Sequence, residues 1–294
     1  MDGASQTADE DPTKASSGTN TDPGGVLESD ASVPGATEHQ GHAVASVLSE
    51  ADLPGLRSHS GRSIAAEDVK EVIGLLDKAG VPACVAGVYA LRYYGAGRIS
   101  NEWDICVPDE KLDDATVIFE NDARFERATP APLLLESLRH TRPTFVLKGV
   151  DFVFILVPAS DYFIDPSPDC CELSNKGIPY PKMPQFARSL LVLQNTSDLC
   201  DFIDGMDLDR TWGESNVDFD DLQLKGLEFT RERNAEFEKL DLGKFKLDVD
   251  YRSMWNRIVD EKEKRIEPMK KGRYKTRWRR VKNDMDPRLK ERPI

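Results

Sequence analysis

The pattern of hydrophobic and polar positions predicts a chain of two structured halves behind a featureless start. Apolar residues spaced three and four apart indicate amphipathic helices, and short apolar runs beside Gly or Pro indicate strands. Neither pattern appears before residue 63, both appear from there to about residue 157, and only long helical periodicity appears after a loop at 158–183. The expected helices are 65–80, 88–94, 110–121, 133–140, 184–204, 219–241 and 250–266, and the expected strands are 83–86, 102–107, 144–147 and 150–157.

These elements indicate an α/β (α+β) fold in which a mixed β-sheet is flanked by helices and followed by an α-helical region. Strands 144–147 and 150–157 are separated only by Lys148-Gly149, which is typical of a hairpin. The expected organisation is a disordered acidic head (1–62), an α/β domain (63–180), a helical region (181–267) and a basic tail (268–294).

Composition supports the disordered head and restricts the class of protein. Residues 1–62 contain no Phe, Trp or Tyr and carry ten acids against three bases, too little apolar surface to offset chain entropy. No run of 18 apolar residues and no basic start followed by an apolar stretch is present, so neither a membrane span nor a secretory signal is expected. The five cysteines form no CxxC pair, so reduced thiols and a cytoplasmic or nuclear location are expected.

Candidate chemistry begins on the expected strand 102–107, whose alternation places Glu102 and Asp104 on one face. The two carboxylates are about 7 Å apart at two residues of strand rise. Adjacent carboxylates repel each other, and a cation between them relieves the repulsion. Hard oxygen ligands of this kind suit Mg²⁺ together with substrate phosphates. The alternative is that both acids lie on the solvated face of an edge strand and hold no ligand.

Two further features complete a possible phosphate site. The strand–Gly87–helix connection presents free backbone N–H groups, which can receive a phosphate, or Gly87 only satisfies a turn. Asp151 is a third acid near the start of an apolar strand, and the alternative is that it simply faces water. A phosphate cradle, a carboxylate pair for metal and a third carboxylate for metal or base are the parts of phosphoryl or nucleotidyl transfer.

The segment VAGVYALRYYGAGRISNEWDI (85–105) resembles the core signature of the polymerase-β-like nucleotidyltransferase superfamily, in particular its AbiEii-like and minimal members. Those members share a Gly-Gly/Ser turn, an Ala-Leu helix, a Gly, an Arg and then an acid-x-Asp strand. The strand that begins Gly149-Val150-Asp151 is similar to the one that carries the third acid in that family. The match covers about residues 65–160, and the chain looks most like a fungal branch.

The resemblance implies a nucleotidyltransferase-type sheet and a Mg²⁺-dependent transfer of NMP from an NTP to an acceptor that is RNA, protein or a small molecule. Glu102, Asp104 and Asp151 would be the catalytic acids and the ligands of two Mg²⁺ ions, and Gly87, Val88 and Arg98 would bind the nucleotide. Val88 stands where catalytic members usually have Ser or Gly, and Glu102 replaces the commoner Asp. The alternative function is therefore a catalytically inactive binding or scaffold protein of the same fold.

The remaining candidates each have two interpretations. Asp198, Asp201 and Asp204 share one helix face, which is either solvated or closes over the nucleotide cleft. Arg98 either contacts nucleotide or pairs with a neighbouring acid. The aromatic residues Tyr93, Tyr94 and Trp103 are expected in the core, and His140 is expected to be structural.

The tail is strongly basic although the net charge of the whole chain is −13. Eight of the thirteen residues from 270 to 282 are Lys or Arg, interleaved with two aromatic residues. This mixture suits nucleic-acid contact, nuclear import, or folding of the tail onto the acidic body. The candidate nucleic-acid contacts are Lys270, Lys271, Arg273, Tyr274, Lys275, Arg277, Trp278, Arg279, Arg280 and Lys282.

Overall fold

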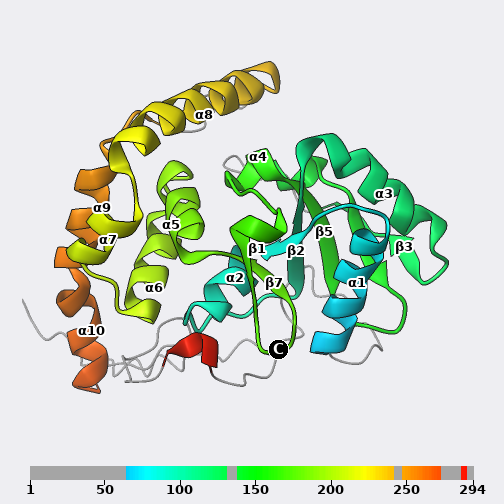
Figure 1. Cartoon of the computed structure of the whole chain (residues 1–294), viewed down its shortest axis with the longest axis horizontal. Helices are drawn as coiled ribbons and strands as arrows, with labels where there is room; N and C mark the ends of the chain where they lie inside the picture. The colour runs from blue at the N-terminus through cyan, green and yellow to red at the C-terminus, as the bar shows by residue number, and fades with distance from the viewer. Residues whose placement is uncertain (1–63, 131–137, 242–246, 273–285, 290–294) are drawn as a thin grey trace, which may run out of the picture. The chain divides into compact units, whose positions relative to one another are not determined.

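A computed structural model describes residues 64–130, 138–241, 247–272 and 286–289, all of which belong to the unit Arg57–Ile294. The first part of this unit is an α/β layer built on a five-stranded sheet in the order β1-β2-β5-β4-β3 (Figure 1). Strands β2 and β5 are parallel and the other neighbours are antiparallel. The strands are β1 (Cys84–Ala86), β2 (Glu102–Val107), β3 (Phe125–Arg127), β4 (Thr144–Leu147) and β5 (Val153–Pro158).

Helices lie against this sheet, and a small hairpin contacts its β1 edge. Helix α3 contacts β3 and β5, whereas α2 contacts β1 and β2. The elements are α1 (Ala66–Lys78), α2 (Gly87–Tyr93), α3 (Leu112–Asn121), α4 (Ala159–Tyr162) and the hairpin β6 (Cys171–Leu173) with β7 (Pro179–Pro181). The predicted α/β class with a mixed sheet flanked by helices is confirmed.

A helical region follows and packs on the α/β layer through α2 and α6. It comprises α5 (Met183–Val192), α6 (Thr196–Met206), α7 (Arg210–Asn216), α8 (Phe219–Lys239), α9 (Tyr251–Asp260) and α10 (Lys262–Lys270). No helix in the described part of the chain has both the length and the apolar composition needed to cross a membrane.

Three predicted elements are corrected. The expected helix 184–204 is two helices, because Gln194 adopts a left-handed backbone (φ 52°) and the Asn195 side chain caps α6 by accepting from the Asp198 N–H at 3.2 Å. The expected helix 250–266 divides at Glu261 into α9 and α10. The expected helix 133–140 falls mostly on residues outside the described ranges, and Arg139–Thr141 form a short 3₁₀ turn.

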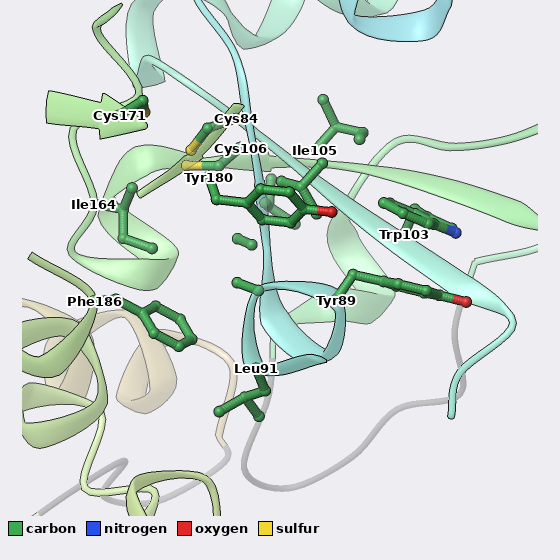
Figure 2. Close-up of a cluster of buried hydrophobic side chains, with 14 of the residues drawn as sticks. Cys84, Tyr89, Leu91, Trp103, Ile105, Cys106, Ile164, Cys171, Tyr180 and Phe186 are labelled. Atoms are coloured by element: carbon green, nitrogen blue, oxygen red, sulfur yellow. The ribbon is translucent and has the colours of Figure 1, made fainter. Parts of the chain in front are cut away.

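Aromatic side chains fill the core between the sheet and the helical region, as predicted. Trp103 and Tyr94 are fully buried, and the Tyr89 ring stacks on Trp103 with ring centroids 3.7 Å apart (Figure 2). Tyr93 is partly buried and stacks on Tyr180 at 4.3 Å. These rings are committed to packing, so none of them is free to stack on a base.

Candidate active site

Strand β2 carries the predicted acid pair and lies inside the sheet, between β1 and β5. Asp104 is register partner of Ala86 on β1 and of Ile155 on β5, and its side chain is 5% exposed. Glu102, at the beginning of the strand, has a side chain that is 36% exposed. The alternative interpretation as two acids on a solvated edge strand is therefore wrong.

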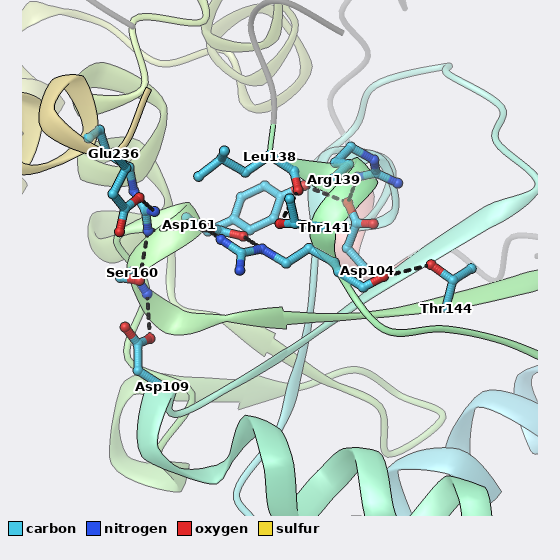
Figure 3. Close-up of polar contacts among 12 residues, drawn as sticks. Asp104, Asp109, Leu138, Arg139, Thr141, Thr144, Ser160, Asp161 and Glu236 are labelled. Atoms are coloured by element: carbon cyan, nitrogen blue, oxygen red, sulfur yellow. Dashed lines mark hydrogen bonds and ion pairs between the residues drawn. The ribbon is translucent and has the colours of Figure 1, made fainter. Parts of the chain in front are cut away.

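A single arginine bridges the two carboxylates. The Arg139 guanidinium donates from Nη1 to Asp104 Oδ2 at 2.6 Å and from Nη2 to Glu102 Oε2 at 2.7 Å. The Tyr162 hydroxyl donates to the same Asp104 Oδ2 at 2.5 Å (Figure 3 draws this group of polar contacts). The two acids thus share one cationic partner, the Arg139 guanidinium.

Burial and charge change the titration of the two groups that hold Asp104. Burial lowers the pKa of Arg139, but the charges of Asp104 and Glu102 outweigh burial and raise it above its ordinary value. Burial, reinforced by the Asp104 charge, raises the pKa of Tyr162 well above its ordinary value. Both side chains therefore remain protonated donors toward Asp104 at neutral pH.

Position 87 requires glycine because its backbone lies close to the Asp104 carboxylate. It begins α2 with φ at +60°, and a Cβ built on it would lie 2.3 Å from Asp104 Oδ2. A side chain here would both strain the backbone and displace the carboxylate. The sequence segment that resembles the family signature therefore brings its glycine and its second acid into direct proximity.

These residues line a cavity of about 510 Å³ between the α/β layer and the helical region. Gly87, Val88, Asp104 and Arg139 form one side of it. The facing side comes from α5, the beginning of α6 and the second half of α8. This volume is in the range of about 300–1,000 Å³ that is typical of small-molecule sites.

A second charged network lines the same cavity and was not predicted. Arg233 of α8, only 4% exposed, pairs with Asp161 of α4 at 2.9 Å and donates to the Ser160 hydroxyl at 2.7 Å. Arg142 also pairs with Asp161, at 2.5 Å. Burial raises the pKa of Asp161, and the two arginines oppose that rise. The network ties α8 to the sheet side of the cavity.

Asp151 does not join the acid pair. Strand β5 begins at Val153, which is the register partner of Glu102, and Asp151 lies in the preceding turn. No group of three or more His, Cys, Asp or Glu in the described residues has the geometry to hold a metal ion.

The two acids on β2 nevertheless suit one divalent cation. Mg²⁺ binds proteins through one or two carboxylates and completes its shell with water and substrate phosphates. Asp104 Oδ1 is buried and has no hydrogen-bond partner, which is the state of an oxygen that awaits a cation. The two carboxylates are therefore a donor set of the kind that suits a divalent cation.

Arg98 and the acids of α6 form a structural connection between the two halves. Arg98 pairs with Asp198 and donates to Asp201 Oδ2 at 2.6 Å, and the cavity lining includes Asp198 but not Arg98. Asp201 and Asp204 are each only 3% exposed, so the expected solvated acidic face is wrong. Arg98 follows the alternative in which it pairs with acids, although its partners lie 100 and 103 residues away rather than on β2.

The basic tail is described only at its two ends. Lys270 and Lys271 pair with Glu263 and Glu267 on α10. Arg288 pairs with Glu172 of β6 at 3.2 Å, so residues 286–289 contact the body. The other candidate nucleic-acid contacts, 273–282, lie outside the described residues.

Sequence reasoning missed the partners of the acids. Arg139, Tyr162 and Arg233 are separated from their partners by 35, 58 and 72 residues. His140 was considered because of its residue type, whereas its neighbour Arg139 makes the contact. The spacing of residues along the chain does not predict pairs that are this far apart in sequence.

Comparisons with known proteins give similarities of fold. No family model matches this sequence, and no curated protein matches it. The chain is similar to the solution structure of the antibiotic-resistance factor ANT(2'')-Ia, with a TM-score of 0.33 and 13% identity over 60% of this chain and 96% of that one. It is also similar to JHP933 from Helicobacter pylori, with a TM-score of 0.30 and 13% identity over 71% of this chain and 97% of that one. A candidate nucleotidyltransferase from H. pylori has a TM-score of 0.31 and 13% identity, over 69% and 96% of the two chains.

Proposed function

We propose that this chain is a nucleotidyltransferase that moves NMP from an NTP to an acceptor hydroxyl, with a divalent cation held by Glu102 and Asp104. The observation that carries the proposal is the pairing of both carboxylates with one guanidinium beside a cavity of nucleotide size that Gly87, Asp104 and Arg139 line. The resemblance of residues 85–105 to the polymerase-β-like superfamily, and within it to AbiEii-like members, supports the same function from the sequence.

The chain's own residues supply binding and orientation in this proposal. Arg139 and Arg233 line the cavity that would receive the triphosphate, and guanidinium groups bind phosphate oxygens with two parallel hydrogen bonds. Gly87 leaves room for close approach at Asp104. Tyr162 fixes the orientation of the Asp104 carboxylate.

The transferred group is the nucleotide α-phosphoryl. The acceptor oxygen forms a bond to the α-phosphorus, the bond to the pyrophosphate oxygen breaks, and the acceptor proton passes to water or to a carboxylate of the pair. A bound Mg²⁺ would neutralise charge on the phosphates and polarise the reacting oxygens. Positioning of the acceptor and the triphosphate supplies the rest of the acceleration.

The test is transfer of label from each α-³²P-NTP in the presence of Mg²⁺, alone and with total RNA. We expect transfer by the wild type and a loss of about 100-fold or more in Asp104→Asn, since a metal ion contributes several kcal/mol of charge stabilisation. Asp114→Asn is the matched control, because Asp114 is a 60% exposed acid on α3 that pairs only with Lys111 at the surface.

Two results would contradict the proposal. Label transfer that persists unchanged in Asp104→Asn would show that the site is elsewhere. Absence of NTP binding by calorimetry in the wild type would exclude a nucleotide enzyme. Binding without transfer to any acceptor would instead indicate the binding role that Val88 suggests.

A further inference from the structure

Arg139 occupies the place between Glu102 and Asp104 where a divalent cation would lie. One guanidinium reaches both carboxylates, at 2.7 Å and 2.6 Å, so its charge sits at their common focus. Ion pairs with this double hydrogen-bond geometry are strong, and this one is largely shielded from water because the Arg139 side chain is 24% exposed. The acid pair is thus already neutralised in part before any metal arrives.

Charge balance prevents the guanidinium and a divalent cation from sharing this focus. Two carboxylates carry −2, whereas Arg139 and a divalent cation together carry +3 in a partly buried site. Like charges a few ångströms apart repel strongly where water is excluded. Binding of the cation to both acids therefore requires the guanidinium to move away.

We propose that Arg139 is an intrinsic counter-ion that competes with the divalent cation for Glu102 and Asp104 and moves onto the nucleotide phosphates when the cation binds. This inference rests on the proposed function, and it assigns to Arg139 the control of metal entry. The Arg139 side chain already lines the cavity, so it can exchange the carboxylates for the triphosphate without leaving that cavity. Metal and nucleotide binding are consequently coupled through one side chain.

The surrounding contacts leave the acid ready after the arginine departs. Tyr162 donates to Asp104 Oδ2 at 2.5 Å independently of Arg139, whereas its own contact with the Arg139 guanidinium is longer, at 3.3 Å. The buried Asp104 Oδ1 has no partner to lose. The carboxylate therefore keeps its orientation while the guanidinium exchanges for the cation.

The experiment measures Mn²⁺ binding in the full-length protein without nucleotide, by the loss of the free Mn²⁺ signal in electron paramagnetic resonance. We expect Arg139→Gln to bind Mn²⁺ about tenfold more tightly than the wild type, within the range of ordinary coupling between competing ligands. Arg127→Gln is the matched control, since Arg127 is 52% exposed and pairs with Glu120 far from the cavity, and it should bind like the wild type. The double variant Arg139→Gln/Asp104→Asn should lose the tight site.

A second measurement tests the coupling. A non-hydrolysable α,β-methylene NTP should increase the Mn²⁺ affinity of the wild type by a larger factor than that of Arg139→Gln, because the wild type alone gains a new partner for its guanidinium. Arg139→Lys, which replaces the two-pronged group with a single point charge, should show an intermediate Mn²⁺ affinity and serves if the Gln variant does not fold by circular dichroism.

The inference is overturned if Arg139→Gln, or Arg139→Lys in its place, binds Mn²⁺ no more tightly than the wild type. It is also overturned if the gain survives Asp104→Asn. Failure of this inference can be told apart from failure of the proposed function. If Arg139→Gln binds Mn²⁺ more tightly but no NTP label is transferred, the counter-ion role of Arg139 is supported and the enzymatic function is excluded.

Discussion

Buried acids on α6 and on β2 are both held by arginines, but they differ in their access to the cavity. On α6, Asp204 receives two hydrogen bonds from Arg265, at 2.7 Å and 3.1 Å, and Asp201 receives one from Arg98. On β2, Asp104 shares one arginine with Glu102 and keeps a buried oxygen without a partner. Asp201 and Asp204 do not line the cavity and fasten the fold, whereas Asp104 lines it, so the difference that matters is access to the cavity rather than the number of hydrogen bonds.

The largest expected effect on stability comes from the α6 cluster. Arg265→Ala removes two hydrogen bonds to Asp204, whose side chain is 2% exposed, and should lower the free energy of unfolding by about 3 kcal/mol, since breaking a buried ion pair is strongly destabilising. Chemical denaturation measures the change. Lys270→Ala on the same helix is the control, because its 46% exposed side chain pairs at the surface and should have little effect. If Arg265→Ala lowered the free energy of unfolding no more than Lys270→Ala does, the acids of α6 would not stabilise the fold, and the contrast with the acids of β2 would be lost.

The next effect tests the β2 site. Gly87→Ala should cost about 1–3 kcal/mol of stability from backbone strain and should also abolish tight Mn²⁺ binding, because the new Cβ displaces Asp104 Oδ2. Gly80→Ala is the matched control: Gly80 has a similar φ of +72°, but its Cβ would meet nothing within 4 Å. Both variants should lose stability, and only Gly87→Ala should lose the metal. If Gly87→Ala and Gly80→Ala bound Mn²⁺ equally well, the close approach of residue 87 to Asp104 would not matter for metal binding.

The sequence predicted those parts of the site that depend on neighbours along the chain. Alternation along β2 placed Glu102 and Asp104 on one face, and the strand–glycine–helix pattern placed Gly87 at the beginning of α2. Both features follow from local periodicity and backbone sterics, which act between near neighbours in the chain.

The parts that failed depend on distant partners or on turn geometry. The three-residue spacing of Asp198, Asp201 and Asp204 is the same on a solvated and on a buried face. Distant partners decide between the two: Arg98 for the first two acids and Arg265, 61 residues away, for Asp204. The hairpin between β4 and β5 was predicted, but its ladder begins at the Val146–Val153 pair, so the turn is longer than Lys148-Gly149 and holds Asp151 outside β5. The pattern of residues along the chain shows neither the distant partner of a side chain nor the register of two paired strands.

The smallest expected effect on stability concerns a surface ion pair, which serves as a reference for the two buried acid clusters. Asp122 and Arg124 are joined by several hydrogen bonds at the surface, where the Arg124 side chain is 45% exposed. The hydrogen bonds from Arg124 lower the pKa of Asp122 to about 2. Because this pKa is lower in the folded state than in the unfolded state, the stabilisation is present above about pH 4 and is lost as pH falls toward 2.

Exposed pairs are screened and contribute little, so Arg124→Gln should leave the unfolding midpoint at pH 7 unchanged within measurement error. Whatever difference from the wild type remains should vanish between pH 4 and pH 2 in denaturation curves recorded at both values. Asp122→Asn should also have little effect at pH 7, and it differs from Arg124→Gln in keeping the Arg124–Glu71 ion pair. A loss at pH 7 comparable to that of Arg265→Ala would mean that burial does not distinguish the pairs, and the contrast between α6 and β2 would then need a cause other than desolvation.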